Sequence, residues 1–432
     1  MDSKFEKTLY KLQSVNTGKL FEDNLWTLDA PEETKPSLIR AIYEKKQLEL
    51  KDNSFGLYRF SDWMPVKRML KGSSAPVTYK SKGLAGKLGL RNLWITFSGY
   101  WPEKGAKMTT CSFKETEAYS VCGRMTSEMN KILVVASAGN TSRSFAKVCS
   151  ENNIPLLLVV PEDYINVLWF DTPINDCVKL ICSRSGSDYY DAIHLSNIVA
   201  ALNGFIPEGG AKNIARRDGM ATTVLSAATT IGKIPEYYFQ AVGSGTGAVS
   251  AWEANLRLLA DGRFGNNKMK LLVSQNAPFN PLLDAWKANS REILPIDSEL
   301  ARKQVEIIDA KVLSNRKPPY PIAGGLYDAL TDSEGDVLIA TNDQLRAASV
   351  LFEETEGIDI HPAAAVATAT LIDAAQNNKI DRNALIMLNI TGGGEKKFAK
   401  ENELHFLKPD LVFDIDPDPE EVKSKITDLF KK

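Results

Sequence analysis

The sequence predicts an α/β protein, because short patterns typical of buried strands alternate with amphipathic helical patterns along most of the chain. Residues 131–136, 156–160 and 178–181 are apolar runs that indicate buried strands. Residues 141–149 and 188–202 follow two of these strands and carry apolar residues at helical spacing. The chain has 432 residues, more than one hydrophobic core normally holds, so we expect two domains.

The second half of the chain continues this alternation. Residues 220–231 have a helical pattern, and residues 237–242 form a strand pattern that enters a glycine-rich turn. A further helix is expected over residues 248–259. The remaining expectations are strands at residues 270–274 and 384–388 and helices at residues 342–355 and 362–375.

Composition excludes several classes of protein. The 52 basic and 54 acidic residues give a formal net charge of -2, which argues against nucleic-acid binding. No apolar stretch approaches the roughly 18 residues of a membrane helix, and the first residues lack the apolar core of a secretion signal. We therefore expect a cytoplasmic protein. The five cysteines and three histidines are dispersed, which predicts reduced thiols and no metal site.

The segment Gly243-Ser244-Gly245-Thr246-Gly247 joins a predicted strand to a predicted helix. Glycines allow backbone N–H groups to converge on an anion, and the start of the following helix adds its positive dipole end. Two hydroxyl groups add further donors. The same residues also fit a plain strand-to-helix turn. A dinucleotide fingerprint fits less well, because Ala248 stands where its third glycine would fall, and the lysine of a P-loop is missing.

The segment from Ser137 to Thr141 (S-A-G-N-T) also joins a strand to a helix. Asn140 can donate an amide N–H to a phenolate or a carboxylate, although Asn and Thr also serve as ordinary helix caps. Arg143 lies in the first helical turn, where the helix dipole disfavours a cation unless an anionic ligand binds there. A solvated surface arginine is the alternative.

Two further segments contain candidate site residues. Lys114 lies in a polar stretch that leads into a helical pattern, as an exposed surface lysine also would. Thr391 follows the last predicted strand and precedes three glycines, Gly392 to Gly394. Three glycines at a strand end indicate close approach of a ligand or of another backbone.

In this order the segments resemble the threonine synthase branch of the fold-type II pyridoxal phosphate enzymes. Ser112-Phe113-Lys114 is similar to the family's S-F-K, and residues 136–141 to its A-S-S-G-N-T. Residues 213–219 (N-I-A-R-R-D-G) parallel its N-P-x-R-x-E-G. Further similarity lies at residues 83–94, 357–364 and 389–392, so that the resemblance spans about residues 60–400.

The resemblance implies two three-layer α/β/α domains with the cofactor in the cleft between them. We expect residues 1–125 to contribute to the large domain and to carry Lys114. Residues 126–225 would form the smaller domain, and residues 226–432 would complete the large one. Relatives usually pair as dimers, so a homo-oligomer is expected.

The resemblance also implies pyridoxal 5′-phosphate as the cofactor, with Lys114 as its Schiff-base lysine. Asn140 would contact the 3′-oxygen of the ring, and Thr391 its pyridine nitrogen. The cofactor phosphate would lie against Gly243, Ser244, Gly245, Thr246 and Gly247. The substrate α-carboxylate would bind to Ser137, Gly139 and Thr141, and a second anion to Arg216.

The chain departs from the family on the substrate side. Residues 98–111 replace the family's E-x-x-N-P-T-G and add the cations Lys104 and Lys107, and Arg143 stands where a small residue is usual. A retained cofactor site beside altered substrate residues suggests a paralogue that converts O-phospho-L-serine and sulfite to L-cysteate and phosphate, as in coenzyme M biosynthesis. Guanidinium groups suit such anions. The candidates for binding phosphate and sulfite are Lys104, Lys107, Arg143 and Arg216, although either lysine also fits a solvated surface charge.

Three other functions stay open on the sequence alone. Threonine synthesis would use O-phosphohomoserine and water, and cysteine synthesis would use O-phospho-L-serine and sulfide. A non-catalytic α/β protein that binds a sugar or nucleotide belongs to a different class, and the absence of bound cofactor in the purified protein would distinguish it.

Overall fold

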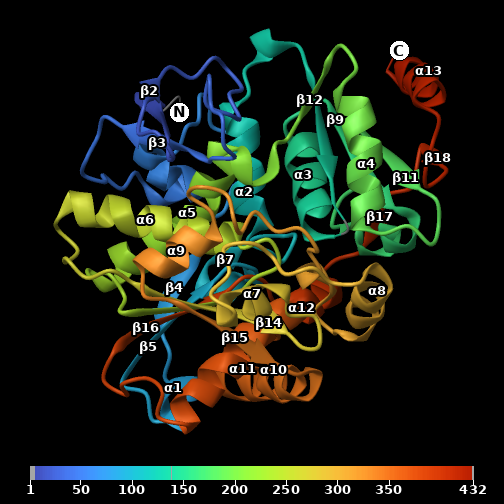
Figure 1. The fold of residues 1–432 in the computed structure, drawn as a ribbon. Helices are drawn as coiled ribbons and strands as arrows, with labels where there is room; N and C mark the ends of the chain where they lie inside the picture. The colour runs from blue at the N-terminus through green and yellow to red at the C-terminus, as the bar shows by residue number, and fades with distance from the viewer. Residues whose placement is uncertain (1–4, 138, 431–432) are drawn as a thin grey trace.

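One mostly parallel sheet and one smaller parallel sheet form the framework of the protein (Figure 1). The computed structural model describes residues 5–137 and 139–430. In the larger sheet every neighbouring pair is parallel except β4 and β5. Its strands, in spatial order, are β15 (Asp336–Ala340), β14 (Lys270–Asn276), β13 (Tyr237–Ala241), β16 (Leu385–Ile390), β5 (Asn92–Phe97) and β4 (Val77–Lys80).

Helices cover both faces of the larger sheet, because its strands carry apolar residues on both faces. Tyr238 and Leu271 pack in the core that includes residues of α5 (Ile214–Ile231) and α6 (Thr246–Asp261). Their neighbours Phe239 and Leu272 face the opposite way, into a core shared with α10 (Asn342–Glu356) and α11 (Pro362–Gln376). Figure 1 shows these two helix pairs on opposite sides of the strands.

The smaller sheet is parallel throughout and is also covered on both faces. Leu156 and Leu158 pack in one core with residues of α2 (Lys114–Arg124) and α3 (Asn140–Glu151), while Leu157 faces α4 (Tyr189–Ala200) and α13 (Pro419–Leu429). In spatial order its strands are β12 (Phe205–Pro207), β8 (Ile132–Ala136), β9 (Leu156–Pro161), β11 (Val178–Ser183) and β18 (Leu411–Phe413).

The N-terminal segment forms a small antiparallel sheet that is anchored to the helices of the large sheet. Its strands are β1 (Tyr10–Ser14), β2 (Leu20–Phe21) and β3 (Ile39–Tyr43). The Tyr43 hydroxyl donates to Asp218 Oδ2 of α5 at 2.6 Å, and Arg40 Nε donates to Glu253 Oε1 of α6 at 3.1 Å. These polar contacts attach the segment to α5 and to α6, the helix that begins at the phosphate-loop candidate.

The remaining elements are short. The α-helices are α1 (Gly83–Leu88), α7 (Pro281–Lys287), α8 (Ser298–Ile307), α9 (Leu326–Asp332) and α12 (Glu395–Glu401). The strand pairs are β6 (Tyr100–Trp101) with β7 (Ala106–Lys107), and β10 (Trp169–Phe170) with β17 (His405–Phe406). The 3-10 helices are η1 (Asn53–Trp63), η2 (Pro102–Lys104), η3 (Ser127–Met129), η4 (Glu162–Val167), η5 (Gly210–Lys212) and η6 (Lys311–Leu313).

The predicted α/β class and its three-layer architecture are confirmed. Every strand and helix expected between residues 131 and 388 is present, with ends that differ by a few residues. The helix expected from residue 220 begins six residues earlier, at Ile214, where the Asn213 side chain accepts from Ala215 N. The expected domain boundaries stay a prediction, and near the C-terminus β18 pairs with β11 of the smaller sheet.

Candidate active site

Lys114 is the first residue of α2, and the backbone before it is tied to the end of β16. Phe113 N donates to Thr391 O at 2.9 Å, and Gly393 N donates to Cys111 O at 3.0 Å. The short β-bridge between Ser112 and Gly392 belongs to the same contact. The fold thus brings two of the predicted site segments, which are far apart in the sequence, side by side.

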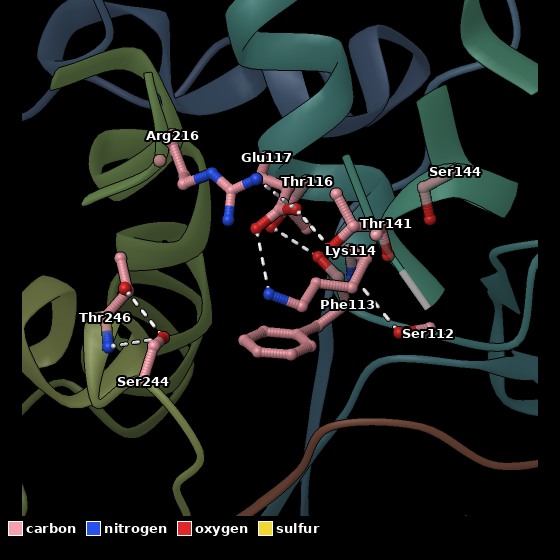
Figure 2. A network of polar contacts seen from close by, with 12 residues as sticks. Ser112, Phe113, Lys114, Thr116, Glu117, Thr141, Ser144, Arg216, Ser244 and Thr246 are labelled. Atoms are coloured by element: carbon pink, nitrogen blue, oxygen red, sulfur yellow. Dashed lines mark hydrogen bonds and ion pairs between the residues drawn. The ribbon is translucent and has the colours of Figure 1, made fainter. Parts of the chain in front are cut away.

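The Lys114 amine forms an ion pair inside a cluster of charged side chains (Figure 2). Its Nζ lies 3.0 Å from Glu117 Oε2, one helical turn further along α2. The other Glu117 oxygen accepts from Thr141 Oγ1 at 3.0 Å and lies 3.3 Å from Arg216 Nη2. Arg216 Nε donates to Glu208 Oε1 at 2.8 Å. We call Lys114, Glu117, Thr141, Glu208 and Arg216 the Lys114 cluster.

Burial and neighbouring charges change the pKa values of this cluster. Burial lowers the pKa of the Lys114 amine, and the Glu117 carboxylate opposes this shift without cancelling it. Burial alone would raise the pKa of Glu117, but the charges of Arg216 and Lys114 and the hydrogen bonds from Lys114 and Thr141 lower it. Burial raises the pKa of Glu208, although Arg216 opposes it. Lys114 therefore loses its proton more easily than a free lysine, beside a carboxylate that stays ionised.

Gly243 to Gly245 lie in the turn between β13 and α6, as predicted, and Thr246 and Gly247 are the first residues of α6. The first N–H groups of α6 have no acceptor within the helix, so they can bind an anion. Ser244 Oγ and Thr246 Oγ1 lie 2.9 Å apart, and Figure 2 shows the Lys114 amine on the side of the site where these hydroxyls lie. Gly245 has a φ of +78°, and a Cβ at Gly243 would lie 3.0 Å from Val312 O. These two glycines are thus also required by the turn and by its packing.

The segment from Ser137 to Thr141 leads into α3, although Ala138 lies outside the described residues. Gly139 N donates to Ser137 Oγ at 3.2 Å, and Asn140 Oδ1 accepts from Arg143 Nη2 at 3.0 Å. Thr141 joins the Lys114 cluster through Glu117. The start of α3 therefore lies next to the Lys114 amine.

Arg143 is buried, with 2% of its side chain exposed, in a different set of contacts. Its guanidinium donates to Thr110 O at 2.8 Å, Val167 O at 3.1 Å, Asn140 Oδ1 at 3.0 Å and Glu395 Oε1 at 3.0 Å. The guanidinium carbon also lies 3.8 Å from the centre of the Trp169 ring. We call these six residues the Arg143 cluster: Thr110, Asn140, Arg143, Val167, Trp169 and Glu395.

The other predicted residues lie in two different environments. Thr391 is 7% exposed and presents a neutral hydroxyl at the end of β16. The glycines after it allow close approach of another backbone, since a Cβ at Gly392 would lie 2.8 Å from Cys111 O. Lys104 and Lys107 are exposed on the β6–β7 hairpin, and Lys104 Nζ lies 5.0 Å from the centre of the Tyr79 ring.

Sequence reasoning missed Glu117 and Glu208, the two carboxylates of the Lys114 cluster. For Glu117 a signal was present, because the family's S-F-K-D-R-G has glycine at the position that Glu117 occupies in this chain. For Glu208, which precedes the N-I-A-R segment by five residues, we find no such signal in the sequence.

Neither a metal-binding cluster nor a membrane-spanning helix is found in the part of the chain that the structure describes. Within residues 5–137 and 139–430, no group of three or more His, Cys, Asp or Glu side chains is arranged to hold a metal ion. Over the same ranges, no helix is both long and apolar enough to cross a membrane.

Comparison with known proteins identifies the family. A model of the pyridoxal-phosphate dependent enzymes matches residues 79–392. The cysteate synthase of Methanosarcina acetivorans is 48% identical over 381 residues, which are 88% of this chain and 91% of that protein. The cysteate synthase of Methanocella paludicola is 46% identical over 404 residues, 93% of each chain.

Solved structures support the fold at much lower sequence identity. Maize serine racemase superposes with a TM-score of 0.57 at 13% identity, covering 76% of this chain and 91% of its own. The processed threonine deaminase isoform 2 of Solanum lycopersicum has a TM-score of 0.55 at 16% identity, covering 76% of this chain and 83% of its own. These likenesses concern the architecture alone.

The residues around Lys114 fit pyridoxal phosphate, which is the cofactor of this family. An amine of lowered pKa can bond to the aldehyde, the N-terminal end of α6 with its hydroxyls can bind the phosphate, and the buried neutral hydroxyl of Thr391 can meet the ring nitrogen. The protein is an enzyme. The chain belongs to the pyridoxal-phosphate dependent enzymes and, among them, to the cysteate synthase family.

Proposed function

We propose that the protein converts O-phospho-L-serine and sulfite to L-cysteate and phosphate. The observation that carries this proposal is the Lys114 amine, which has a lowered pKa and lies beside the start of α3 in a chain about 48% identical to cysteate synthases. The reaction requires that a proton be removed from an amino acid that carries several negative charges. The site has an amine that can accept this proton.

Lys114 has two tasks in this proposal. It holds the cofactor covalently until the substrate takes its place, and its free Nζ then accepts the proton from the substrate α-carbon. Pyridoxal phosphate, when bound, would supply stabilisation for the negative charge left on the α-carbon. After phosphate has left the β-carbon and sulfite has added there, Lys114 Nζ returns the proton to the α-carbon.

Thr391 determines which reaction follows proton removal. The neutral hydroxyl of Thr391 would not hold the ring nitrogen of the cofactor protonated as a carboxylate would, so the ring would draw in less negative charge. Loss of the β-phosphate is then favoured over transamination. The buried position of Thr391 at the end of β16 supports this role.

The anionic groups are assigned to donors by position. Gly243, Ser244, Gly245, Thr246 and Gly247 would bind the cofactor phosphate, and Asn140 its ring oxygen. Ser137, Gly139 and Thr141 would bind the substrate α-carboxylate at the start of α3. Among the cations proposed for phosphate and sulfite, Arg216 is supported best, because it belongs to the Lys114 cluster. Arg143 already donates to four protein acceptors, and Lys104 and Lys107 are exposed.

The proposal also includes a homo-oligomer that acts in the cytoplasm. We retain the division into residues 1–125, 126–225 and 226–432. The strands of the two sheets follow this division except β18.

Identification of the product tests the proposed function. Purified protein loaded with pyridoxal phosphate is given O-phospho-L-serine with and without sulfite, and phosphate release and cysteate are measured. We expect both only when sulfite is present, and neither with Lys114→Ala. Release with O-phosphohomoserine and water would instead indicate threonine synthesis, and cysteine formed with sulfide would indicate cysteine synthesis. Either result, with no cysteate, contradicts the proposal.

A further inference from the structure

Glu117 is the carboxylate that pairs with Lys114, and neither the family resemblance nor the mechanism above gives it a task. It lies three residues after Lys114, so both side chains are on the same face of the first turn of α2. Its side chain is 0% exposed, whereas 21% of the Lys114 side chain is exposed. The pair therefore joins a buried carboxylate to a lysine whose side chain is partly exposed.

A purely structural helix pair does not account for this arrangement. Exposed pairs at this spacing contribute little to helix stability, whereas burying a charge without full compensation is strongly destabilising. Glu117 is compensated by two hydrogen-bond donors, Lys114 of α2 and Thr141 of α3, and by an ion pair with Arg216 of α5. This arrangement holds one ionised carboxylate in a fixed place, 3.0 Å from the Lys114 amine.

We propose that Glu117 is a positioning residue that holds the Lys114 amine when it is free of the cofactor and stabilises the ammonium that it becomes. This inference rests on the proposed function for its place in turnover. When the substrate is deprotonated, the bond between the α-carbon and its hydrogen breaks and an N–H bond forms at Lys114 Nζ. The electron pair stays with the substrate carbon. Glu117 takes no proton; its negative charge faces the positive charge that appears on Lys114.

The electrostatic surroundings define what Glu117 adds. The charges that act on the Lys114 amine come from Glu117 on its own helix, Arg216 on α5 and Glu208 in the loop before α5. Arg216 opposes a charged amine, and the two carboxylates favour it. Tyr189 of α4 also acts electrostatically on Arg216 and favours its charged form. Glu117 is the largest of the contributions that favour the ammonium, so its removal lowers the pKa of Lys114 further.

Capture of the cofactor by the full-length apoprotein tests this proposal without any substrate. Lys114 attacks pyridoxal phosphate only as the neutral amine, so the capture rate rises with pH through the pKa of Lys114. Glu117→Gln removes the negative charge and keeps the size of the side chain. At a pH one unit below the wild-type midpoint we expect this variant to capture pyridoxal phosphate about five- to tenfold faster, the effect of losing one opposite charge within about 4 Å. Visible absorbance of the bound cofactor follows the rate.

Two matched variants make the result specific. Glu115→Gln alters a buried carboxylate of the same helix that accepts from Thr110 N at 2.6 Å and does not pair with Lys114. We expect its pH profile to match that of the wild type. Glu117→Asp keeps the charge and should keep the midpoint close to that of the wild type, even if Glu117→Gln proves too unstable to isolate.

Specific outcomes overturn the inference. It fails if Glu117→Gln captures cofactor with the wild-type pH dependence, or if Glu115→Gln shifts the midpoint equally. The inference also fails if the midpoint of Glu117→Asp differs from the wild-type midpoint as much as that of Glu117→Gln does. Because no phosphoserine or sulfite is present, a negative product assay for the proposed function leaves this result unaffected.

Discussion

The Lys114 cluster and the Arg143 cluster meet at the start of α3, yet their cations have different partners. Thr141 joins the first through Glu117, and Arg143, two residues later, belongs to the second. In the Lys114 cluster two cations face two carboxylates that are nearly inaccessible. In the Arg143 cluster one guanidinium faces two backbone carbonyls, an amide oxygen, an indole ring and a half-exposed carboxylate.

This difference separates two uses of a buried cation. Backbone carbonyls neither titrate nor move away from the chain, so they hold Arg143 in place over the whole working pH range. The contacts of Arg143 join α3 to the segment before α2, to η4 and to α12. Carboxylates and amines exchange protons and change pKa when a neighbour changes charge. The Lys114 cluster is therefore suited to proton transfer, and the Arg143 cluster to holding the walls of the site together.

The largest expected effect is on catalysis, at the centre of the Lys114 cluster. Lys114→Ala removes both the covalent attachment of the cofactor and the base, so we expect turnover to fall by about 10⁴-fold or more, equivalent to about 5.5 kcal/mol in the barrier. Phosphate release from O-phospho-L-serine with sulfite measures the effect. We expect the free energy of unfolding to fall by about 1 to 2 kcal/mol, because the buried Glu117 carboxylate loses Lys114 but keeps Thr141 and Arg216.

A Lys114→Ala protein that retained turnover within tenfold of the wild type would place the base elsewhere. Urea unfolding of Lys114→Ala is the control. If most of the variant were unfolded under assay conditions, its loss of turnover would reflect unfolding and not the loss of the base.

The spacing of apolar residues in the sequence predicted the strands, the helices and their layered arrangement, because this spacing depends only on residues a few positions apart. Ser112-Phe113-Lys114 and Gly243 to Gly247 were recognisable for the same reason. The partners of Arg143 were not, since Val167 and Glu395 are far from it in sequence and one of them contributes only its backbone carbonyl. Glu117 was visible one turn after Lys114, but its charge state depends on Arg216, which α5 brings to it.

The second expected effect is on stability, in the Arg143 cluster. Arg143→Met keeps much of the apolar stem but leaves Thr110 O and Val167 O without their donor, so we expect the free energy of unfolding to fall by about 3 kcal/mol. Urea unfolding of the loaded protein measures it. In the part of the variant protein that stays folded, the concentrations of phosphoserine and sulfite that give half-maximal turnover should stay close to those of the wild type.

The opposite pattern would assign Arg143 to the substrate. If the variant unfolds like the wild type and needs much more sulfite or phosphoserine, while the bound cofactor absorbs as before, then Arg143 binds one of these anions as the sequence led us to expect. Arg143→Lys refines the comparison, because a point charge cannot reproduce the several contacts of a guanidinium fork.

The smallest expected effect concerns Glu395, the partner that makes the Arg143 cluster look like an ion-pair site. Its side chain is 37% exposed, so water screens the pair, whereas Glu117 in the other cluster is fully buried. We expect Glu395→Gln to lower the free energy of unfolding by less than about 1 kcal/mol, with turnover unchanged. The amide oxygen still accepts from Arg143, and the two carbonyl contacts are untouched. A loss comparable to that of Arg143→Met would show instead that the charge pair, and not the backbone carbonyls, holds this wall of the site.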